Sequence, residues 1–199
     1  MKEILFATGN ASKVARFSEK LLEKGILLKS LKDIDISLEI EENGKTAIEN
    51  AKIKAKAYYE ATKMITMAMD DTMYIDDIPE DKQPGVFVRR INGKRLNDEE
   101  MIKYYTNLAH TYGKDGKLTC KWVYGIAVIN HNTESTYSWS KEDFYIVDKP
   151  SNKINPGYPL NTISINKKLN KYFTEITEEE KKLIKENELD VIEFIYKNL

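Results

Sequence analysis

The sequence predicts a mixed α/β protein whose later part is an antiparallel meander. Three observations lead to this fold class. A short apolar run precedes a helical pattern at the beginning of the chain, a second helical pattern precedes a second apolar run, and strand-like segments follow one another beyond residue 117. No internal repeat, low-complexity segment or linker interrupts this order. We therefore expect residues 1–199 to form a single compact domain.

The first expected elements are a strand, a tight turn and a helix. Ile4 to Ala7 is a short apolar run, and apolar residues recur at helical spacing from Val14 to Leu22. Between them, Thr8-Gly9-Asn10 has the composition of a turn. The chain therefore passes from a strand into a helix within a few residues.

A second helix and a second strand are expected next. From Ile48 to Tyr59, apolar residues gather on one face and the lysines mostly on the other, which is typical of an amphipathic helix. The apolar run from Met64 to Met69 then predicts a strand that stops at Asp70-Asp71. The second strand should therefore present two carboxylates at its C-terminal end.

The remaining part of the chain reads as a helix, three strands and a helical tail after an irregular connection around Pro79, Pro84 and Gly85. The expected helix runs from Asp98 to Leu108 and is capped by Asn97 or Asp98. The expected strands run from Leu118 to Asn130, from Glu134 to Ser140 and from Phe144 to Val147, with a hairpin turn at His131-Asn132 between the first two. The tail helix is expected to open on the capping box Thr177-Glu178-Glu179-Glu180 and to pack through Val191, Phe194 and Ile195.

Composition excludes several classes of function. The 31 Lys and Arg residues balance 32 Asp and Glu residues, so no overall positive field is available to hold a nucleic acid. No run of about 18 apolar residues could span a membrane, and the first residues read as a strand rather than a signal peptide. We expect a cytoplasmic protein. Its single cysteine, Cys120, should be a buried apolar residue rather than a metal ligand or a reactive thiol.

The turn Thr8-Gly9-Asn10-Ala11-Ser12-Lys13 is a candidate phosphate site. Backbone N–H groups at a helix N-terminus attract anions, Gly9 allows a tight turn, and Lys13 adds a mobile positive charge. A triphosphate is the ligand that these features favour. The alternative is an ordinary capped turn with an exposed lysine.

The pair Asp70-Asp71 is a candidate magnesium site. Hard divalent cations take carboxylate oxygens together with phosphate oxygens, so one aspartate could bind the metal while the other orients or deprotonates water. The alternative is a solvated turn, which is also the interpretation we give to Asp76 and Asp77.

The segment Glu41-Glu42-Asn43-Gly44-Lys45-Thr46 and the following Glu49 form a third candidate. A glutamate of this loop could complete the metal site, and Glu49 could support it. Thr46 and Glu49 also stand at capping-box spacing, so Glu49 could have a purely structural role.

Together these motifs resemble the inosine triphosphate pyrophosphatase family. The resemblance is carried by T-G-N-x-x-K, E-E-x-G-K-T-x-x-E-N-A-x-x-K-A, D-D-T and P-G-V-F-V-R-R, in this order and spacing. It is close over residues 1 to 90 and weaker from Lys121-Trp122-Val123-Tyr124 to the tail segment Thr177-Glu178-Glu179-Glu180-Lys181. It implies a twisted mixed central sheet and two lobes with a nucleotide cleft between them.

The resemblance also implies an activity, a cofactor and a set of site residues. The activity is cleavage of a nucleoside triphosphate to the monophosphate and pyrophosphate with Mg²⁺, and the expected assembly is a homodimer. The implied metal ligands are Glu41 and Asp71, with Asp71 also acting on water and Asp70 supporting it. The implied substrate-binding residues are Thr8, Gly9, Asn10, Lys13, Lys54, Thr72, Arg90, Gly157, Tyr158 and Lys181.

The sequence departs from the family where the base is read. Members carry a phenylalanine-glycine-tyrosine-aspartate run, whereas this chain has Pro156-Gly157-Tyr158-Pro159. Members also carry a serine-histidine-arginine near the C-terminus, where this chain has Lys185-Glu186-Asn187. Loss of the arginine removes a strong donor to a purine 6-oxo group. The sequence thus favours an enzyme of shifted or relaxed base preference, with a catalytically inactive nucleotide-binding sensor as the alternative.

Overall fold

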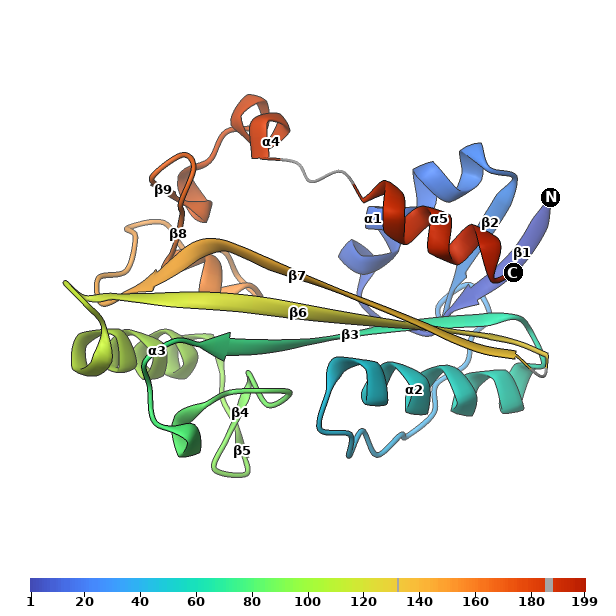
Figure 1. Cartoon of the computed structure of the whole chain (residues 1–199), viewed down its shortest axis with the longest axis horizontal. Helices are drawn as coiled ribbons and strands as arrows, with labels where there is room; N and C mark the ends of the chain where they lie inside the picture. The colour runs from blue at the N-terminus through green and yellow to red at the C-terminus, as the bar shows by residue number, and fades with distance from the viewer. Residues whose placement is uncertain (132, 185–187) are drawn as a thin grey trace. The chain divides into compact units, whose positions relative to one another are not determined.

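The computed structural model describes residues 1–131, 133–184 and 188–199. Within these residues the chain has five α-helices and a seven-stranded mixed sheet in the order β2-β1-β3-β6-β7-β8-β9 (Figure 1). It divides into two compact units. The first unit comprises Met1–Asp71, Tyr124–Trp139 and Asn187–Leu199, and the second comprises Thr72–Val123 and Ser140–Glu186.

The helices and strands have the following bounds. The helices are α1 (Ala11–Glu23), α2 (Ala47–Thr62), α3 (Asp98–Tyr112), α4 (Glu178–Ile184) and α5 (Leu189–Lys197), and short 3-10 helices cover Glu80–Lys82, Pro159–Thr162 and Phe173–Glu175. The strands are β1 (Lys2–Phe6), β2 (Ile26–Ser30), β3 (Thr66–Ile75), β4 (Arg90–Ile91), β5 (Lys94–Arg95), β6 (Lys117–Asn130), β7 (Thr133–Val147), β8 (Ser164–Asn166) and β9 (Lys171–Tyr172).

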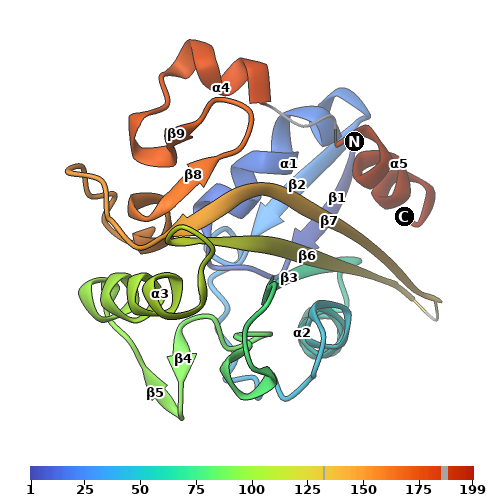
Figure 2. The ribbon, with the colours of Figure 1, turned by 60° about the vertical axis from the view of Figure 1, so that its left-hand side comes forward.

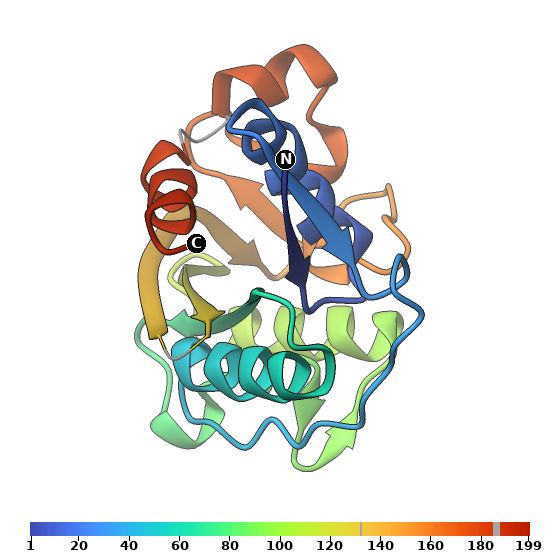
Figure 3. The same cartoon turned by 90° about the vertical axis from the view of Figure 1, so that its right-hand side faces the viewer.

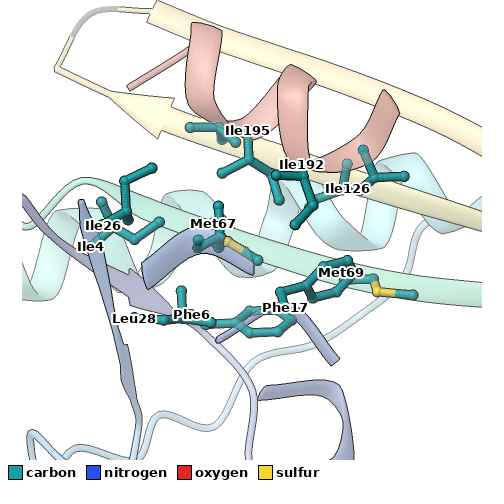
Figure 4. Close-up of a cluster of buried hydrophobic side chains, with 13 residues drawn as sticks. Ile4, Phe6, Phe17, Ile26, Leu28, Met67, Met69, Ile126, Ile192 and Ile195 are labelled. Carbon is teal, nitrogen blue, oxygen red and sulfur yellow. The ribbon is translucent and has the colours of Figure 1, made fainter. Parts of the chain in front are cut away.

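The strands of the first unit are buried on both faces. β1 pairs in parallel with β2 and with β3, and successive side chains of each strand point to opposite faces. On one face, Ile4, Phe6, Met67 and Met69 pack against α1 and α5 (Figure 4). On the other face the strands pack against α2, so the three helices cover both faces of this part of the sheet (Figure 3).

Small residues let α2 lie close to the sheet. Ala51 and Ala55 of the helix are fully buried against Ala68 and Ala127 of the strands. A Cβ atom on Gly125 of β6 would lie 2.4 Å from the backbone nitrogen of Ile48, so only glycine allows this approach. The start of α2 is therefore fixed against the sheet.

The second unit is built around α3 and the strand segments beside it (Figure 2). The side chain of Asn97 accepts a hydrogen bond from the backbone N–H of Glu100, and the Glu100 side chain accepts one from Asn97, which closes a capping box at the start of α3. Met101 and Tyr105 of α3 are buried in an apolar cluster with residues of β3, β6 and β7. Cys120 lies in the same cluster, and burial raises the pKa of its thiol to about 12, as expected for an unreactive cysteine.

Most of the expected elements are confirmed, including the capping boxes of α2 and α4. Three expectations are wrong. β3 does not stop at Asp70-Asp71 but continues to Ile75, because Thr72, Met73 and Ile75 are buried and extend its apolar pattern past the charged pair. The two strands expected between residues 134 and 147 are one continuous strand, β7. The single tail helix expected after Thr177 is two helices, α4 and α5. In addition, β2 was not among the expected elements. The hairpin turn is confirmed at His131, while Asn132 lies outside the described residues.

The described part of the chain contains no helix that is long and apolar enough to cross a membrane.

Candidate active site

Asn10 organises the candidate phosphate turn. It is the N-cap of α1, and its Oδ1 accepts hydrogen bonds from the backbone N–H groups of Ser12 at 2.9 Å and Lys13 at 3.4 Å. The hydroxyl of Thr8 accepts one from the backbone N–H of Asn10 at 3.2 Å. Gly9 has open space on the side where a Cβ would stand. The polar side chains thus shape the turn, while the backbone around Gly9 stays open to a ligand.

Lys13 joins this turn to the acidic strand. Its ammonium group donates a hydrogen bond to Oδ1 of Asp71 and forms an ion pair with it. Asp71 follows Met67 and Met69 at a spacing of two residues, so it lies on the face of β3 that α1 covers. The side chains of Lys13 and Asp71 keep 23% and 30% of their exposure, so both remain accessible to a ligand.

Asp70 faces the other side of the strand. It follows Ala68 on the face covered by α2, and Asn50 of that helix donates a hydrogen bond to its carboxylate. Burial raises the pKa of Asp70, while Lys54, the hydrogen bond from Asn50 and Lys13 act in the opposite direction. The expected convergence of two carboxylates at a strand end is therefore wrong, because neighbouring residues of a continuing strand point to opposite faces.

A stripe of three side chains on α2 holds the acidic loop. Asn50, Lys54 and Tyr58 are spaced by one helical turn each. The Oδ1 of Asn50 accepts a hydrogen bond from the backbone N–H of Gly44 at 2.8 Å. The hydroxyl of Tyr58 accepts a hydrogen bond from the backbone N–H of Leu38 at 3.2 Å.

Between these two contacts, Lys54 forms an ion pair with Glu42 at 2.7 Å. The loop from residue 38 to 44 thus runs antiparallel to the helix, and we call these three contacts the α2 ladder. Gly44 is required here, because a Cβ atom would lie 2.6 Å from Oδ1 of Asn50. Asn50 and Tyr58 are almost fully buried, which makes the ladder a rigid support.

The ladder and the phosphate turn line one pocket of about 230 Å³ in the first unit. Its walls are formed by Ala7, Thr8, Gly9, Leu31, Leu38, Ile40, Glu42, Lys54 and Tyr58. The carboxylate of Glu42 lies at this pocket through its pair with Lys54, whereas Glu41 is exposed and is not among the lining residues. Glu49 has the structural role considered from the sequence, because its side chain accepts hydrogen bonds from the backbone of Lys45 and Thr46.

The site residues expected in the second unit are less connected. Thr72 is only 1% exposed and its hydroxyl donates to the carbonyl of Val123, so it is engaged within the strands. Arg90 is exposed and lines a pocket of about 350 Å³ with Phe87 and Tyr104. Lys181 forms an ion pair with Glu178 of its own helix, α4.

Gly157 and Tyr158 lie in a tight turn. The backbone N–H of Tyr158 donates to the carbonyl of Asn155, and Gly157 adopts a left-handed conformation with φ of 81°. The side chain of Tyr158 is 45% exposed. The tail segment Lys185-Glu186-Asn187, where the family's histidine and arginine are replaced, lies outside the described residues.

The residues around Asp71 fit a magnesium ion that is bound largely through its substrate. No three Asp, Glu, His or Cys side chains cluster as a metal cage anywhere in the described ranges. Mg²⁺ does not need such a cage, because it usually takes one or two carboxylates together with phosphate oxygens and water. Asp71, an accessible carboxylate beside the cationic side chain of the phosphate turn, has the chemistry that such a ligand needs.

Sequence reasoning missed Asn50 as a functional candidate, although a signal for it was present. Asn50 is a polar residue one helical turn before Lys54 and next to the buried Ala51. A buried amide of this kind needs hydrogen-bond partners, which here are the backbone of Gly44 and the carboxylate of Asp70.

Known proteins are similar to this chain in sequence and in fold. The Ham1 family model matches residues 4–188. The chain is 32% identical over 184 residues to the dITP/XTP pyrophosphatase of Bacillus subtilis. The aligned region covers 92% of this chain and 90% of that protein. It is 32% identical over 181 residues to the dITP/XTP pyrophosphatase of Halalkalibacterium halodurans, with 91% of each covered.

A solved structure agrees with the fold. The HAM1 protein from Coxiella burnetii superposes with a TM-score of 0.74 at 25% identity, over 99% of this chain and 98% of that one. The mixed α/β fold expected from the sequence is thereby confirmed.

Proposed function

The chain belongs to the Ham1 family and is a nucleoside triphosphate pyrophosphatase, and we propose that its first unit holds the triphosphate and the catalytic carboxylate. The family and the enzyme class expected from the sequence are thus confirmed. The reaction adds water to a nucleoside triphosphate and yields a nucleoside monophosphate and pyrophosphate. One observation carries the assignment of the site: the ion pair between Lys13 of the phosphate turn and Asp71 of β3.

We propose that phosphate binding separates this ion pair. A phosphate oxygen competes with Asp71 for the ammonium group of Lys13, since both are anionic acceptors. Lys13 then holds the triphosphate together with Thr8, Gly9 and Asn10, and Lys54 offers a second positive charge in the pocket. Asp71, released from Lys13, is then free for metal-coupled activation of the attacking water.

Magnesium is the proposed cofactor, held by Asp71 with Glu41 as the second protein ligand. When bound, such an ion neutralises phosphate charge and polarises the phosphorus that water attacks. Asp70 supports Asp71 from the opposite face of β3, where Asn50 holds its carboxylate.

In the second unit we propose that Gly157 and Tyr158 contact the base, with Arg90 and Lys181 as additional cations for the substrate. We leave Thr72 out of this set because its hydroxyl is buried and already donates to Val123. We propose that the enzyme works in the cytoplasm as a homodimer. In each protomer, residues 1–199 form one two-lobed domain.

The test is a pyrophosphate-release screen over standard and deaminated nucleoside triphosphates, with and without Mg²⁺. We expect magnesium-dependent release from at least one of them, and no release from any would favour the nucleotide-binding sensor. Lys13→Ala should weaken triphosphate binding about tenfold or more, because a charge-assisted contact is worth roughly 1.5–3 kcal/mol. Lys52→Ala is the matched control, because Lys52 of the same helix pairs with Glu134 of β7 and does not line this pocket. Equal triphosphate affinity in the wild type and Lys13→Ala would contradict the role of the turn.

A further inference from the structure

An ion pair holds the turn that carries Tyr158. Arg89 donates from Nη1 to Oδ1 of Asp98 at 2.7 Å, and the other carboxylate oxygen of Asp98 accepts the backbone N–H of Gly157 at 2.6 Å. The second guanidinium nitrogen of Arg89 lies 3.5 Å from the carbonyl oxygen of Gly157. The backbone N–H and the carbonyl of Gly157 are therefore both bound by the Arg89–Asp98 ion pair.

Each partner of this pair is fixed by its own surroundings. Asp98 is the first residue of α3, directly after the Asn97 cap, and a helix N-terminus favours a carboxylate. Arg89 also lies 3.5 Å from the carbonyl of Leu96, and the backbone N–H of Leu96 donates to the carbonyl of Arg89. The Arg89–Asp98 ion pair is thus fixed at the start of α3, and Gly157 is hydrogen-bonded to it.

Gly157 is suited to being attached in this way. It has a φ of 81° and no atom near the position of a Cβ, so its peptide groups can turn toward the ion pair without steric hindrance. The next residue, Tyr158, presents an exposed ring. The backbone carbonyl of Tyr158 accepts a hydrogen bond from the N–H of Asn161 within the following 3-10 helix, so the turn continues into an ordered segment.

We propose that Arg89 and Asp98 are positioning residues that fix the Gly157-Tyr158 turn for contact with the nucleotide base. This proposal rests on the proposed function of that turn.

The chain offers a matched control for this ion pair. Lys94 of β5 forms an ion pair with Glu100 at 2.5 Å, which also joins the β4-β5 region to the first turn of α3. Within the described residues, the hydrogen bonds of Gly157 to this region go to Asp98 and Arg89 and not to Lys94 or Glu100. Lys94→Ala therefore removes a more exposed ion pair from the first turn of α3 and leaves the contacts of Gly157 in place.

The experiment combines hydrogen exchange of residues 155–160, followed by mass spectrometry, with steady-state kinetics of pyrophosphate release. In Arg89→Ala we expect amide exchange at the turn to rise about tenfold, because Asp98, the acceptor of the Gly157 N–H, loses its ion-pair partner and the Gly157 carbonyl loses its charged donor. KM should rise about tenfold while kcat stays within about twofold, as expected when substrate positioning rather than chemistry is affected. Asp98→Asn keeps an acceptor for Gly157 but loses the charge, so its effects should be smaller and in the same direction.

Three results would overturn the proposal: unchanged exchange in both variants, faster exchange with unchanged KM, or the same changes in Lys94→Ala. If the wild type releases no pyrophosphate, the proposed function fails separately. Equilibrium dialysis with a non-hydrolysable triphosphate then replaces KM, and the positioning role is still decided by exchange and affinity together.

Discussion

Two loops that carry candidate site residues are held in different ways. The loop from residue 38 to 44 is fixed along α2 by the α2 ladder, whose Asn50 and Tyr58 are almost fully buried. The turn at Gly157 and Tyr158 is fixed by Arg89 and Asp98, whose side chains keep 31% and 33% of their exposure. A buried hydrogen bond is costly to lose and is little affected by salt, whereas a half-exposed ion pair is weaker and screened.

This difference matches the division of tasks that we propose. Phosphates are common to all nucleoside triphosphates, so a rigid support for the phosphate half serves every substrate. The base varies from one substrate to the next. A turn that is held by a modest, replaceable contact can change its preference without disturbing the phosphate half.

The largest expected effect is on the phosphate half. Asp71→Asn should lower kcat about a hundredfold or more, because an amide cannot supply the anionic ligand and base that the reaction needs, a loss on the order of 3 kcal/mol. Pyrophosphate release by correctly folded protein measures it. Activity close to that of the wild type would exclude Asp71 as ligand and base.

Breaking the ladder should mainly reduce stability. Asn50→Ala leaves the backbone N–H of Gly44 and the carboxylate of Asp70 without their partner, which should cost about 1–3 kcal/mol in the free energy of unfolding. Urea unfolding followed by tryptophan fluorescence checks this value. Lys52→Ala, on the same helix but in a half-exposed ion pair with Glu134, should cost less than about 1 kcal/mol. Equal losses in the two variants would mean that the ladder is no stronger than a surface contact.

The base half should discriminate weakly. The family's aspartate is replaced by Pro159, and its histidine and arginine by Glu186 and Asn187. We expect kcat/KM for inosine triphosphate to exceed that for adenosine triphosphate by about tenfold or less, or about 1.4 kcal/mol. Measuring both substrates under the same conditions decides the point. A ratio in the thousands would show that other groups rebuild a strongly selective base pocket.

The smallest expected effect concerns pH. Hydrogen bonds from Arg89 and from the backbone of Gly157 lower the pKa of Asp98 below its usual 3.8. A lowered carboxyl pKa contributes stability above the usual value and loses it as the pH falls through the lowered one.

The free energy of unfolding of the wild type should therefore exceed that of Asp98→Asn by at most about 1 kcal/mol at pH 7. This difference should stay constant down to about pH 5 and shrink below 3.8. Denaturant unfolding at several pH values measures it. A difference that grows on acidification would contradict the assigned direction.

The sequence predicts the fold where local patterns and buried faces agree. The helix after the Thr8-Gly9-Asn10 turn and the helix with the Thr46 capping box follow from spacing and cap residues alone. The continuation of β3 was missed because two aspartates inside a strand look like its end. Only pairing with neighbouring strands, which is not local, keeps Thr72 to Ile75 extended.

The candidate site shows the same limit. Lys13 and Asp71 were identified separately from motifs, and the structure brings them together across 58 positions of the sequence. The ladder could be anticipated only in part, because the i, i+4 spacing of Asn50 and Lys54 is visible but their partners on the loop are not. The sequence does not reveal the role of the Arg89–Asp98 pair, because the pair binds the backbone of Gly157, which lies 59 positions beyond Asp98.

The core of the first unit also bears on how the protein is made. Ile4 and Phe6 pack in one cluster with Val191, Ile192 and Ile195 of α5 (Figure 4). At roughly 5–20 residues per second, a ribosome needs about 10–40 s between these two segments. Throughout that interval the apolar face of β1 and α1 lacks the part of its cover that α5 supplies. A chain that ends before Val191 therefore carries the phosphate turn on an incomplete core.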